Sequence, residues 1–507
     1  MLSIFKNAEQ HAERVALRDE TGSYTYKDIV KASNKTASAL IGDDSDLKEK
    51  RIGFLIPPSF EYVSILWGIW KAGGIGIPLS QSATELELTH YLNDSKISLL
   101  ISDKEGSEKL RKLATNLQIP LMTTDDLQGK EGGALPQIGL ERRAMILYTS
   151  GTTNKPKGVV STHANIAAQI SSLVNAWEWN ENDQIPLILP LHHIHGIINS
   201  LSCPLWIGAK VDILGAFEVE KVVKAVCEND YTVFTAVPTI YFSLIDKLEH
   251  MEDKELDLTK EKFKAMRLMM SGSAALAPEI HKRWKDLTEQ SLLERYGMTE
   301  IGMALSNPLN GEKRAGSVGQ ALPKVEVCLM EDNKVITEEN IPGEIMIKGP
   351  QVFLEYWNQQ RTTEDSFFEG WFKTGDVAEL VDGYYKILGR DSVDIIKSGG
   401  YKISALEIED VLLRHPMIKE CAVVGIADQK WGEVVAVALC SNEDLTLEEI
   451  QTWSLDFLSD YKIPRKLKLL EKLPKNAMGK IVKRCLLYTS DAADDTPCVD
   501  LGGRRII

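Results

Sequence analysis

The stretch that decides the fold is YTSGTTNKPKG, residues 148–158. An apolar run at 144–147 leads into it, and two valines follow it directly. The stretch offers backbone N–H groups, hydroxyl groups and two lysines to a polyphosphate, and its glycines allow close approach. It is not the GxxxxGK[ST] nucleotide loop, because no GKS or GKT opens a helix. The alternative interpretation is a polar hairpin between two buried strands.

Composition places the chain among soluble globular proteins. The 507 residues are long enough for roughly three domain-sized cores. A formal net charge of −15 argues against a nucleic-acid binder. Seven cysteines without CxxC spacing predict free thiols in a reducing compartment, with neither a disulfide framework nor a zinc site.

The sequence predicts no membrane span, because no run of ~18 uncharged apolar residues occurs. The first twenty residues lack the apolar core of a signal peptide and the Arg/Ser-rich pattern of a transit peptide. We therefore expect the protein in the cytoplasm or the mitochondrial matrix. The sequence predicts no particular oligomeric state.

The N-terminal part alternates short apolar strands with helical patterns. Such a rhythm predicts βαβ units and a largely parallel sheet. The expected strands are 52–57, 75–79, 94–102, 185–189, 211–214 and 232–235, with a helix over 60–72 after the first.

The pattern of predicted elements changes near residue 390. After it, helices no longer alternate with single strands, and two strands follow each other directly. We predict an α/β fold: a large N-terminal part (1–390) with parallel and mixed sheets, and a smaller, mobile C-terminal α+β domain (391–487). Residues 488–507 show no core-like periodicity. They are interpreted as a non-native or disordered tail.

The loop at 148–158 resembles the phosphate loop of the adenylate-forming acyl-CoA synthetase family. Four more segments match this family in the right order, so the resemblance covers nearly everything from residue 10 to 484. They are SGSAA (271–275), ERYGMTE (294–300), WFKTGD (371–376) and PKNAMGK (474–480). Asn154 stands where the family usually has glycine, and Asn tolerates positive φ better than most residues.

The resemblance implies ATP, Mg²⁺ and coenzyme A as cofactors and a small carboxylic acid as substrate. It makes Tyr296 an adenine-side aromatic, Thr299 an α-phosphate hydroxyl and Glu300 the Mg²⁺ carboxylate; Asp376 and Arg390 would clamp the ribose. The implied ATP- and AMP-binding residues are Thr149, Ser150, Gly151, Thr152, Thr153, Lys155, Lys157, Gly272, Ser273, Ala274, Tyr296, Gly297, Met298, Asp376 and Arg390.

The C-terminal domain of this family uses two faces in turn. Lys480 resembles the lysine of the adenylation face, where a cation stabilises the developing phosphoryl charge. The loop at 398–404 resembles the thioester face. Its implied CoA-binding residues are Ser398, Gly399, Gly400 and Tyr401. The hinge falls on Asp391 or Ser392, because GRDSVD is one residue longer than the commoner pattern.

The acid is expected to contact Ser271, Arg295 and a gate at His193. An arginine on a pocket-lining strand can pair bidentately with a second carboxylate. An ion pair between Arg295 and Glu294 or another acid is the alternative. The sequence around ERYGMTE and GRDSVDIIKSGG resembles that of malonyl-CoA synthetases of the plant and mitochondrial type. This resemblance implies malonate as the substrate, and methylmalonate as a second one.

Two other functions stay open from the sequence. In a medium- or long-chain fatty acyl-CoA ligase, Arg295 would be only structural. The other is a non-catalytic nucleotide-binding relative. The joint presence of Lys480, Glu300 and Asp376 argues against it.

Overall fold

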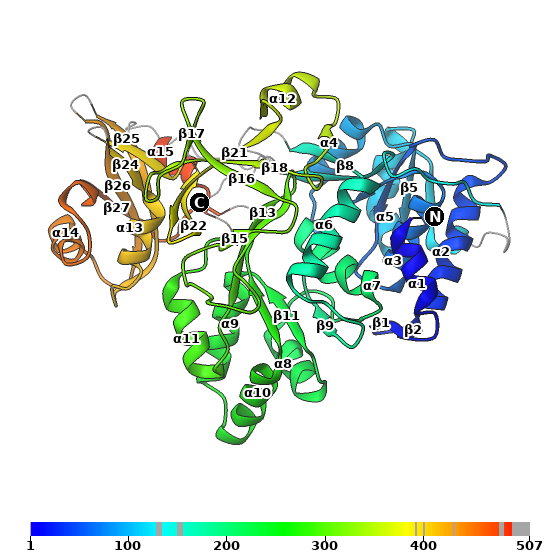
Figure 1. Ribbon diagram of the computed structural model, residues 1–507, viewed down its shortest axis with the longest axis horizontal. Coiled ribbons are helices and arrows are strands. Elements are labelled where there is room, and N and C mark those ends of the chain that lie inside the picture. Colours follow the sequence, from blue (N-terminus) through cyan, green and yellow to red (C-terminus); the bar gives the residue numbers. More distant parts are fainter. Residues whose placement is uncertain are drawn as a thin grey trace. The chain divides into compact units, whose positions relative to one another are not determined.

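The computed structural model describes residues 2–127, 134–149, 156–390, 393–398, 401–428, 431–475 and 481–488. The chain forms two compact units, drawn in Figure 1. The first comprises Met1–Glu326 with Ile347–Phe372, and the second Val327–Met346 with Lys373–Ile507. The predicted boundary near residue 390 lies inside the second unit, at the end of strand β22 (Tyr384–Arg390), and stays a prediction.

A seven-stranded sheet in the first unit contains the predicted βαβ units. Its strands are β3 (Arg51–Leu55), β4 (Ile75–Pro78), β5 (Leu99–Ser102), β6 (Leu121–Thr123), β7 (Arg143–Thr149), β8 (Lys157–Thr162) and β19 (Glu355–Tyr356). The order is β19-β8-β7-β4-β3-β5-β6, and β4, β3, β5 and β6 pair in parallel. Because β4 is apolar and buried at every position, it suits a parallel strand that is covered on both faces.

The helices of this layer are α2 (Tyr26–Ile41), α3 (Phe60–Lys71), α4 (Glu85–Ser95) and α5 (Lys104–Asn116). The predicted helix over 60–72 is confirmed as α3. The Ser59 hydroxyl caps it by accepting a hydrogen bond from the Tyr62 N–H. The indole of Trp70 donates to the Ala144 carbonyl at 2.8 Å, which fixes α3 against β7. Figure 1 shows α2 and α3 side by side, and both contact each other along their length.

Two further sheets complete the first unit. One has the order β2-β1-β10-β9, and the other β11-β12-β13-β14-β15. Their strands are β1 (Val15–Asp19), β2 (Gly22–Thr25), β9 (Gln184–Leu187), β10 (Lys210–Ile213), β11 (Val233–Ala236), β12 (Leu268–Ser271), β13 (Leu293–Met298), β14 (Gly302–Ser306) and β15 (Gln320–Ala321). The strands expected at 185–189, 211–214 and 232–235 are thus confirmed within one to two residues.

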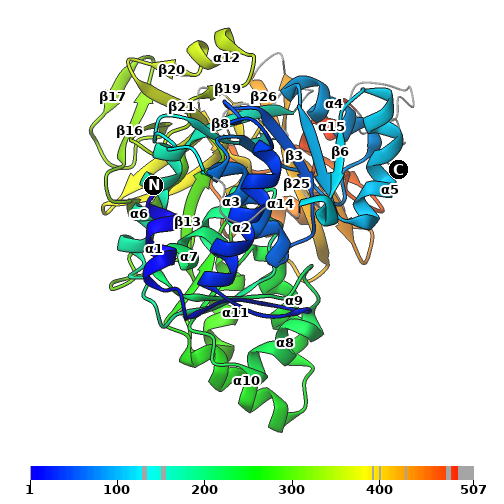
Figure 2. The same ribbon diagram turned by 90° about the vertical axis from the view of Figure 1, so that its right-hand side faces the viewer.

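Helices pack beside these two sheets. They are α1 (Ser3–Gln10), α6 (His163–Ala176), α7 (Cys203–Ile207), α8 (Val219–Glu228), α9 (Pro238–Glu249), α10 (Asp253–Ala265) and α11 (Pro278–Thr288), with the π-helix η2 (His195–Ser202). Helices α8 to α11 contact one another and gather together in Figure 2. Trp284 of α11 packs edge-to-face on Tyr241 and Phe263 at centroid distances of 5.1 and 5.0 Å.

A six-stranded sheet leads into the C-terminal part. It contains β16 (Glu326–Glu331), β17 (Lys334–Ile336), β18 (Gly343–Lys348), β20 (Phe367–Phe368), β21 (Trp371–Val381) and β22, and α12 (Gln360–Asp365) precedes β20. The C-terminal elements are β23 (Ile395–Ser398), β24 (Tyr401–Ser404), α13 (Ala405–Leu412), β25 (Ile418–Asp428), β26 (Gly432–Ser441), α14 (Leu447–Leu455), β27 (Lys466–Leu469) and α15 (Lys483–Tyr488).

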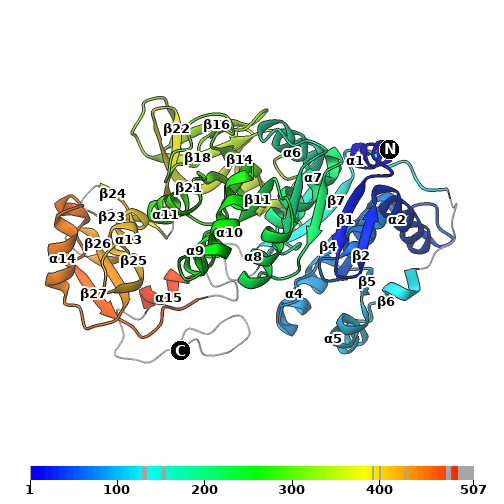
Figure 3. The same cartoon turned by 90° about the horizontal axis from the view of Figure 1, so that it is seen from below.

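The C-terminal sheet buries both of its faces. Val423 and Val437 lie in a core with Ile408 of α13 and Ile450 of α14. The alternate strand positions face a second core that includes Leu486 of α15. Figure 3 shows this sheet with α13 and α14 in orange. The predicted α/β fold class is confirmed. In the described part of the chain, no helix combines the length and apolar character needed to cross a bilayer.

Candidate active site

The strands on either side of the predicted phosphate loop pair with each other, and Thr149 and Lys157 are register partners. The Thr149 hydroxyl is buried and has no hydrogen-bond partner among the described residues. The Lys157 ammonium lies 4.9 Å from the centroid of the Tyr356 ring. A polar atom that needs a partner and a cation therefore flank the loop, and both suit a phosphate ligand.

Ten of the predicted site or hinge residues lie outside the described residues: Ser150, Gly151, Thr152, Thr153, Lys155, Asp391, Ser392, Gly399, Gly400 and Lys480. Their roles stay predictions.

The carboxylate of Glu300 is buried at the end of β13. The Tyr356 hydroxyl donates a hydrogen bond to its Oε1 at 2.9 Å, and the Phe353 N–H donates to its carbonyl at 2.7 Å. Thr299 beside it is half-buried. No group of three or more His, Cys, Asp or Glu suited to a metal occurs within the described ranges. A single carboxylate fits Mg²⁺, which is usually held by one or two carboxylates together with phosphate oxygens.

Arg295 is a buried cation on β13. Its residue is 3% exposed, and its Nε and Nη2 have no hydrogen-bond partner among the described residues. Burial lowers the pKa of Arg295 to about 9, and the Tyr241 phenol opposes this shift. The guanidinium therefore stays charged at pH 7, although none of the described residues forms an ion pair with it.

The alternative of an ion pair with Glu294 is wrong for the described residues. Successive side chains of a strand point to opposite faces, so Glu294 and Arg295 diverge. The Glu294 Oε1 accepts a hydrogen bond from the Gly316 N–H at 2.8 Å.

The turn after β12 packs directly on Arg295. A Cβ placed on Gly272 would lie 2.5 Å from Cζ and 2.8 Å from Nε of Arg295, closer than atoms in contact allow. A side chain at 272 would therefore require the guanidinium to move. Ser271, the last residue of β12, is buried, and its hydroxyl has no partner among the described residues. Ser273 and Ala274 are exposed at the next positions.

Three histidines lie at or just before the start of η2. The rings of His192 and His193 lie 4.2 Å apart and are half-buried, and burial lowers the pKa of both. His195 is buried and lies within hydrogen-bond distance of Ser273 and Thr235. Sequence reasoning assigned the gate to His193 and missed the contacts of His195.

The rest of the ERYGMTE segment is held by a close strand pairing. The Gly297 Cα faces the Gly302 carbonyl so closely that a Cβ would overlap it. Tyr296 and Met298 on either side are half-buried. The segment is therefore fixed in place while its side chains remain partly accessible.

In the second unit, Asp376 and Arg390 are cross-strand partners of β21 and β22. The Arg390 Nε lies 3.0 Å from Asp376 Oδ1, and the Asp376 side chain is 9% exposed. Ser398 and Tyr401 pair at the end of the β23–β24 hairpin. The exposed Tyr401 ring stacks on Tyr461 at 4.4 Å. The geometry thus joins each of these predicted pairs.

Sequence reasoning missed Asn199 in η2 and the contact between Tyr356 and Glu300. Both side-chain atoms of Asn199 in η2 are buried without a partner among the described residues. The π-helix that holds Asn199 is rare and frequently marks functional sites. Tyr356 holds Glu300 from 56 residues away. No local motif signals contacts at such separations.

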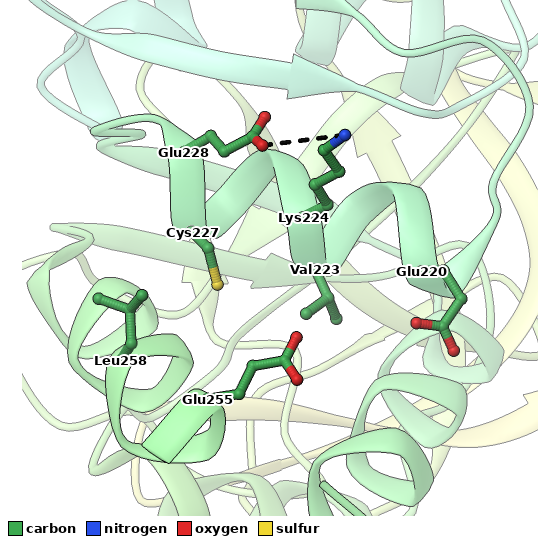
Figure 4. A pocket seen from close by; sticks show the side chains of 7 residues that line it. All are labelled: Glu220, Val223, Lys224, Cys227, Glu228, Glu255 and Leu258. Carbon is green, nitrogen blue, oxygen red and sulfur yellow. Dashed lines mark ion pairs between the residues drawn. The ribbon is translucent and has the colours of Figure 1, made fainter. Parts of the chain in front are cut away.

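A surface groove between α8 and α10 is separate from all these residues. Its volume is about 440 Å³. Figure 4 shows its lining: Glu220, Val223, Lys224, Cys227, Glu228, Glu255 and Leu258. The Lys224 ammonium lies 3.9 Å from Glu228, and both are well exposed. None of the predicted site residues lines this groove, so it is no part of the candidate site.

Comparison with known proteins identifies the family of the chain. Residues 4–357 match the AMP-binding enzyme family, and residues 407–480 match the AMP-binding enzyme C-terminal domain. The mitochondrial malonate–CoA ligase of Bos taurus is 40% identical over 96% of this chain and 89% of its own. A malonate–CoA ligase of Arabidopsis thaliana is 40% identical over 95% and 87%.

Solved structures similar to this chain include ligases of the same kind. ATP-bound MatB from Rhodopseudomonas palustris superposes with a TM-score of 0.87 at 28% identity, covering 96% of this chain and 99% of that one. A malonyl-CoA ligase bound to methylmalonyl-CoA and AMP gives a TM-score of 0.69 at 33% identity, covering 94% and 100%. The phosphate-loop flanks, the buried Glu300 and the paired Asp376 and Arg390 are therefore found in a chain that belongs to the AMP-binding enzyme family.

Proposed function

We propose that this protein is an ATP-dependent acid–thiol ligase that converts malonate to malonyl-CoA, and that it also accepts methylmalonate. The observation that carries the proposal is the buried guanidinium of Arg295, whose Nε and Nη2 have no hydrogen-bond partner among the described residues. A dicarboxylate supplies the missing negative charge, whereas a fatty acid does not. The malonate–CoA ligases that are about 40% identical over nearly the full chain support the same substrate.

The reaction has two steps. One carboxylate oxygen of malonate attacks the α-phosphorus of ATP, which forms malonyl-AMP and releases pyrophosphate. The CoA thiolate then attacks the acyl carbon and AMP leaves. Arg295 binds the distal carboxylate, which takes no part in either bond change, and so orients the reacting one.

The described residues divide the remaining work. Thr149 and Lys157 bind the phosphates beside the loop, and Gly272, Ala274 and Tyr296 pack against the base. Glu300 would hold Mg²⁺, which neutralises phosphate charge when bound. Thr299 orients the α-phosphate. Asp376 accepts hydrogen bonds from the ribose hydroxyls, and Arg390 holds Asp376 in place through their 3.0 Å ion pair.

An acid panel tests the function. Thioester formation is measured with malonate, methylmalonate, acetate, butyrate and palmitate at saturating ATP and CoA. We expect malonate to have the highest kcat/KM, followed by methylmalonate. A preference for palmitate would establish the fatty acyl-CoA ligase alternative. Absence of AMP release with every acid would establish the non-catalytic alternative.

The proposed role of Lys480 is tested by separating the half-reactions. Lys480→Ala should slow acyl-AMP formation by ~10²-fold, the scale of one lost charge contact in the transition state. Thioester formation from pre-made malonyl-AMP should be spared. Equal losses in both half-reactions would contradict the use of two faces.

Of the two predicted locations, we propose the mitochondrial matrix. The vertebrate relatives that share about 40% identity are named as mitochondrial proteins. Fractionation of cells that express the full gene product tests this. Recovery of the protein in the cytosol would contradict it.

A further inference from the structure

His195 joins three segments that are distant in sequence. It is 5% exposed and begins the π-helix η2. Its Nδ1 lies 3.1 Å from the Ser273 Oγ, and its Nε2 lies 2.7 Å from the Thr235 Oγ1. These partners are 78 and 40 residues away along the chain. The imidazole therefore bridges the turn after β12 to strand β11.

The two partners differ in rigidity. Thr235 is buried in β11 and is the register partner of Met270 in the parallel neighbour β12. Ser273 lies beyond the end of β12 and is exposed. One side of the imidazole is thus fixed to the sheet, and the other side reaches the loop that leaves it.

Ser273 has a backbone conformation that needs support. Its φ is +70°, in the left-handed region that residues with a Cβ disfavour. Because Ser273 is an exposed residue beyond the end of β12, little packing around it imposes this conformation. The hydrogen bond to His195 ties the Ser273 side chain to the sheet and so favours it.

The protonation state of His195 suits a bridge between two hydroxyl groups. Burial, the Arg295 charge and the neighbouring His193 together hold the pKa of His195 well below its usual range. A neutral imidazole has one donor and one acceptor nitrogen, and a hydroxyl can take either role. Both contacts are therefore satisfied without a charge next to the guanidinium.

We propose that His195 is a positioning residue of the nucleotide site. By fixing Ser273 to β11, it sets the course of the main chain at 272–274, against which the adenine packs. His195 itself touches neither ATP nor the acid. This inference rests on the proposed role of 272–274 in nucleotide binding, and it does not depend on which acid is activated.

Calorimetric binding of AMP to the full chain tests the proposal without any acid. His195→Phe keeps a ring but loses both hydrogen bonds, and it should weaken the AMP Kd about tenfold, the scale of one to two neutral hydrogen bonds. His195→Asn can still reach Ser273 from the Nδ1 position, and it should stay within about threefold of the wild type. Thr235→Val keeps the shape of the side chain but removes its hydrogen bond to the imidazole. Its AMP Kd should lie between those of His195→Phe and His195→Asn.

His281→Phe is the matched control. His281 is also buried, its Nε2 lies 3.1 Å from the Leu292 carbonyl, and burial lowers its pKa as well. Its replacement removes a buried hydrogen bond and should lower Tm. Because it has no contact with the loop at 272–274, the AMP Kd should not change.

A double-mutant cycle completes the test. Ser273→Ala loses the same hydrogen bond from the other side, so His195→Phe/Ser273→Ala should bind AMP no more weakly than the weaker single variant. Additive losses would overturn the proposal. So would an AMP Kd within twofold of the wild type in His195→Phe, or an equal loss in His281→Phe. If His195→Phe does not fold, Thr235→Val and Ser273→Ala decide the question alone. If the wild type binds AMP normally but does not activate malonate, the proposed substrate is wrong and the role of His195 is unaffected.

Discussion

Two cations that are largely shielded from solvent, one in each unit, have opposite surroundings. Lys483 in α15 has its ammonium 2.6 Å from Asp394 Oδ1 and 2.7 Å from Glu409 Oε1. Burial alone would lower the pKa of Lys483, but the two carboxylates outweigh it and raise the pKa. Arg295 has no such partner among the described residues, and burial lowers its pKa.

The difference separates a structural charge from a binding charge. A buried ion is tolerated when its counterions come from the protein, and then it holds segments together. Through its two ion pairs, Lys483 holds α15 to Glu409 of α13 and to Asp394. Asp394 in turn accepts a hydrogen bond from the Arg390 N–H at 3.1 Å. A buried ion without a counterion destabilises the free protein, and a ligand of opposite charge can remove that cost.

The largest expected effect comes from breaking the paired site. Lys483→Met leaves Asp394 and Glu409, whose side chains are only 16% and 13% exposed, without a cation, which should cost about 3–5 kcal/mol of unfolding free energy. Hydrogen exchange of the β25 and β26 amides measures this loss locally. Protection within 1 kcal/mol of the wild type would contradict a structural role, whereas Lys483→Arg should restore most of it.

Arg295→Leu should have the opposite pattern. Removing the guanidinium leaves the distal carboxylate of malonate buried and unpaired, which costs roughly 2–5 kcal/mol, or about 30- to several-thousand-fold in kcat/KM. Butyrate has no distal charge and should be unaffected or improved. Tm should stay equal or rise, because the free protein loses an uncompensated charge. Parallel losses on malonate and butyrate would reduce Arg295 to a structural residue.

A smaller effect is expected from crowding the guanidinium. Gly272→Ala places a methyl group against Cζ and Nε of Arg295. Overpacking of about 1–3 kcal/mol should displace the fork and lower kcat/KM for malonate relative to butyrate by about 5- to 100-fold. The ratio of the two acids is the readout, since a general defect in nucleotide binding lowers both. An unchanged ratio would show that the guanidinium moves aside freely.

The smallest effect is expected when the positive charge at 295 is kept and the shape of the charged group is changed. Arg295→Lys retains a cation but loses the planar fork, so at least one hydrogen bond to the carboxylate is lost and kcat/KM for malonate should fall about tenfold. Steady-state kinetics at two salt concentrations measure it. A loss as large as that of Arg295→Leu would mean that the shape of the guanidinium, and not its charge, selects the acid.

Much of the fold was predictable because the buried strands are short apolar runs. The strands β3, β4 and β9 to β11 lie where such runs predicted them, and α3 lies where the helical spacing did. The residue types of the site were also predictable, since ERYGMTE and WFKTGD are local patterns. Whether Arg295 pairs with an acid was not predictable, because that depends on what the rest of the fold places around β13.

Contacts across long sequence separations were the second limit. The bond from Tyr356 to Glu300 spans 56 residues, and those from His195 span 40 and 78. Hydroxyl and imidazole groups pair with many partners, so composition alone does not choose among them. The sequence therefore placed His193 at the site and gave His195 no role.

The contact between Gly272 and Arg295 has a consequence for redesigning the enzyme. The three atoms that a Cβ on Gly272 would overlap all belong to the guanidinium. A leucine at 295 lacks every one of them, so the acid-specificity change opens a space that an alanine at 272 can fill. Arg295→Leu and Gly272→Ala are each expected to harm malonate activation, yet together they form a compatible pair. Retargeting this enzyme to short monocarboxylates is therefore best attempted with a coupled change, one on β13 and one in the turn after β12.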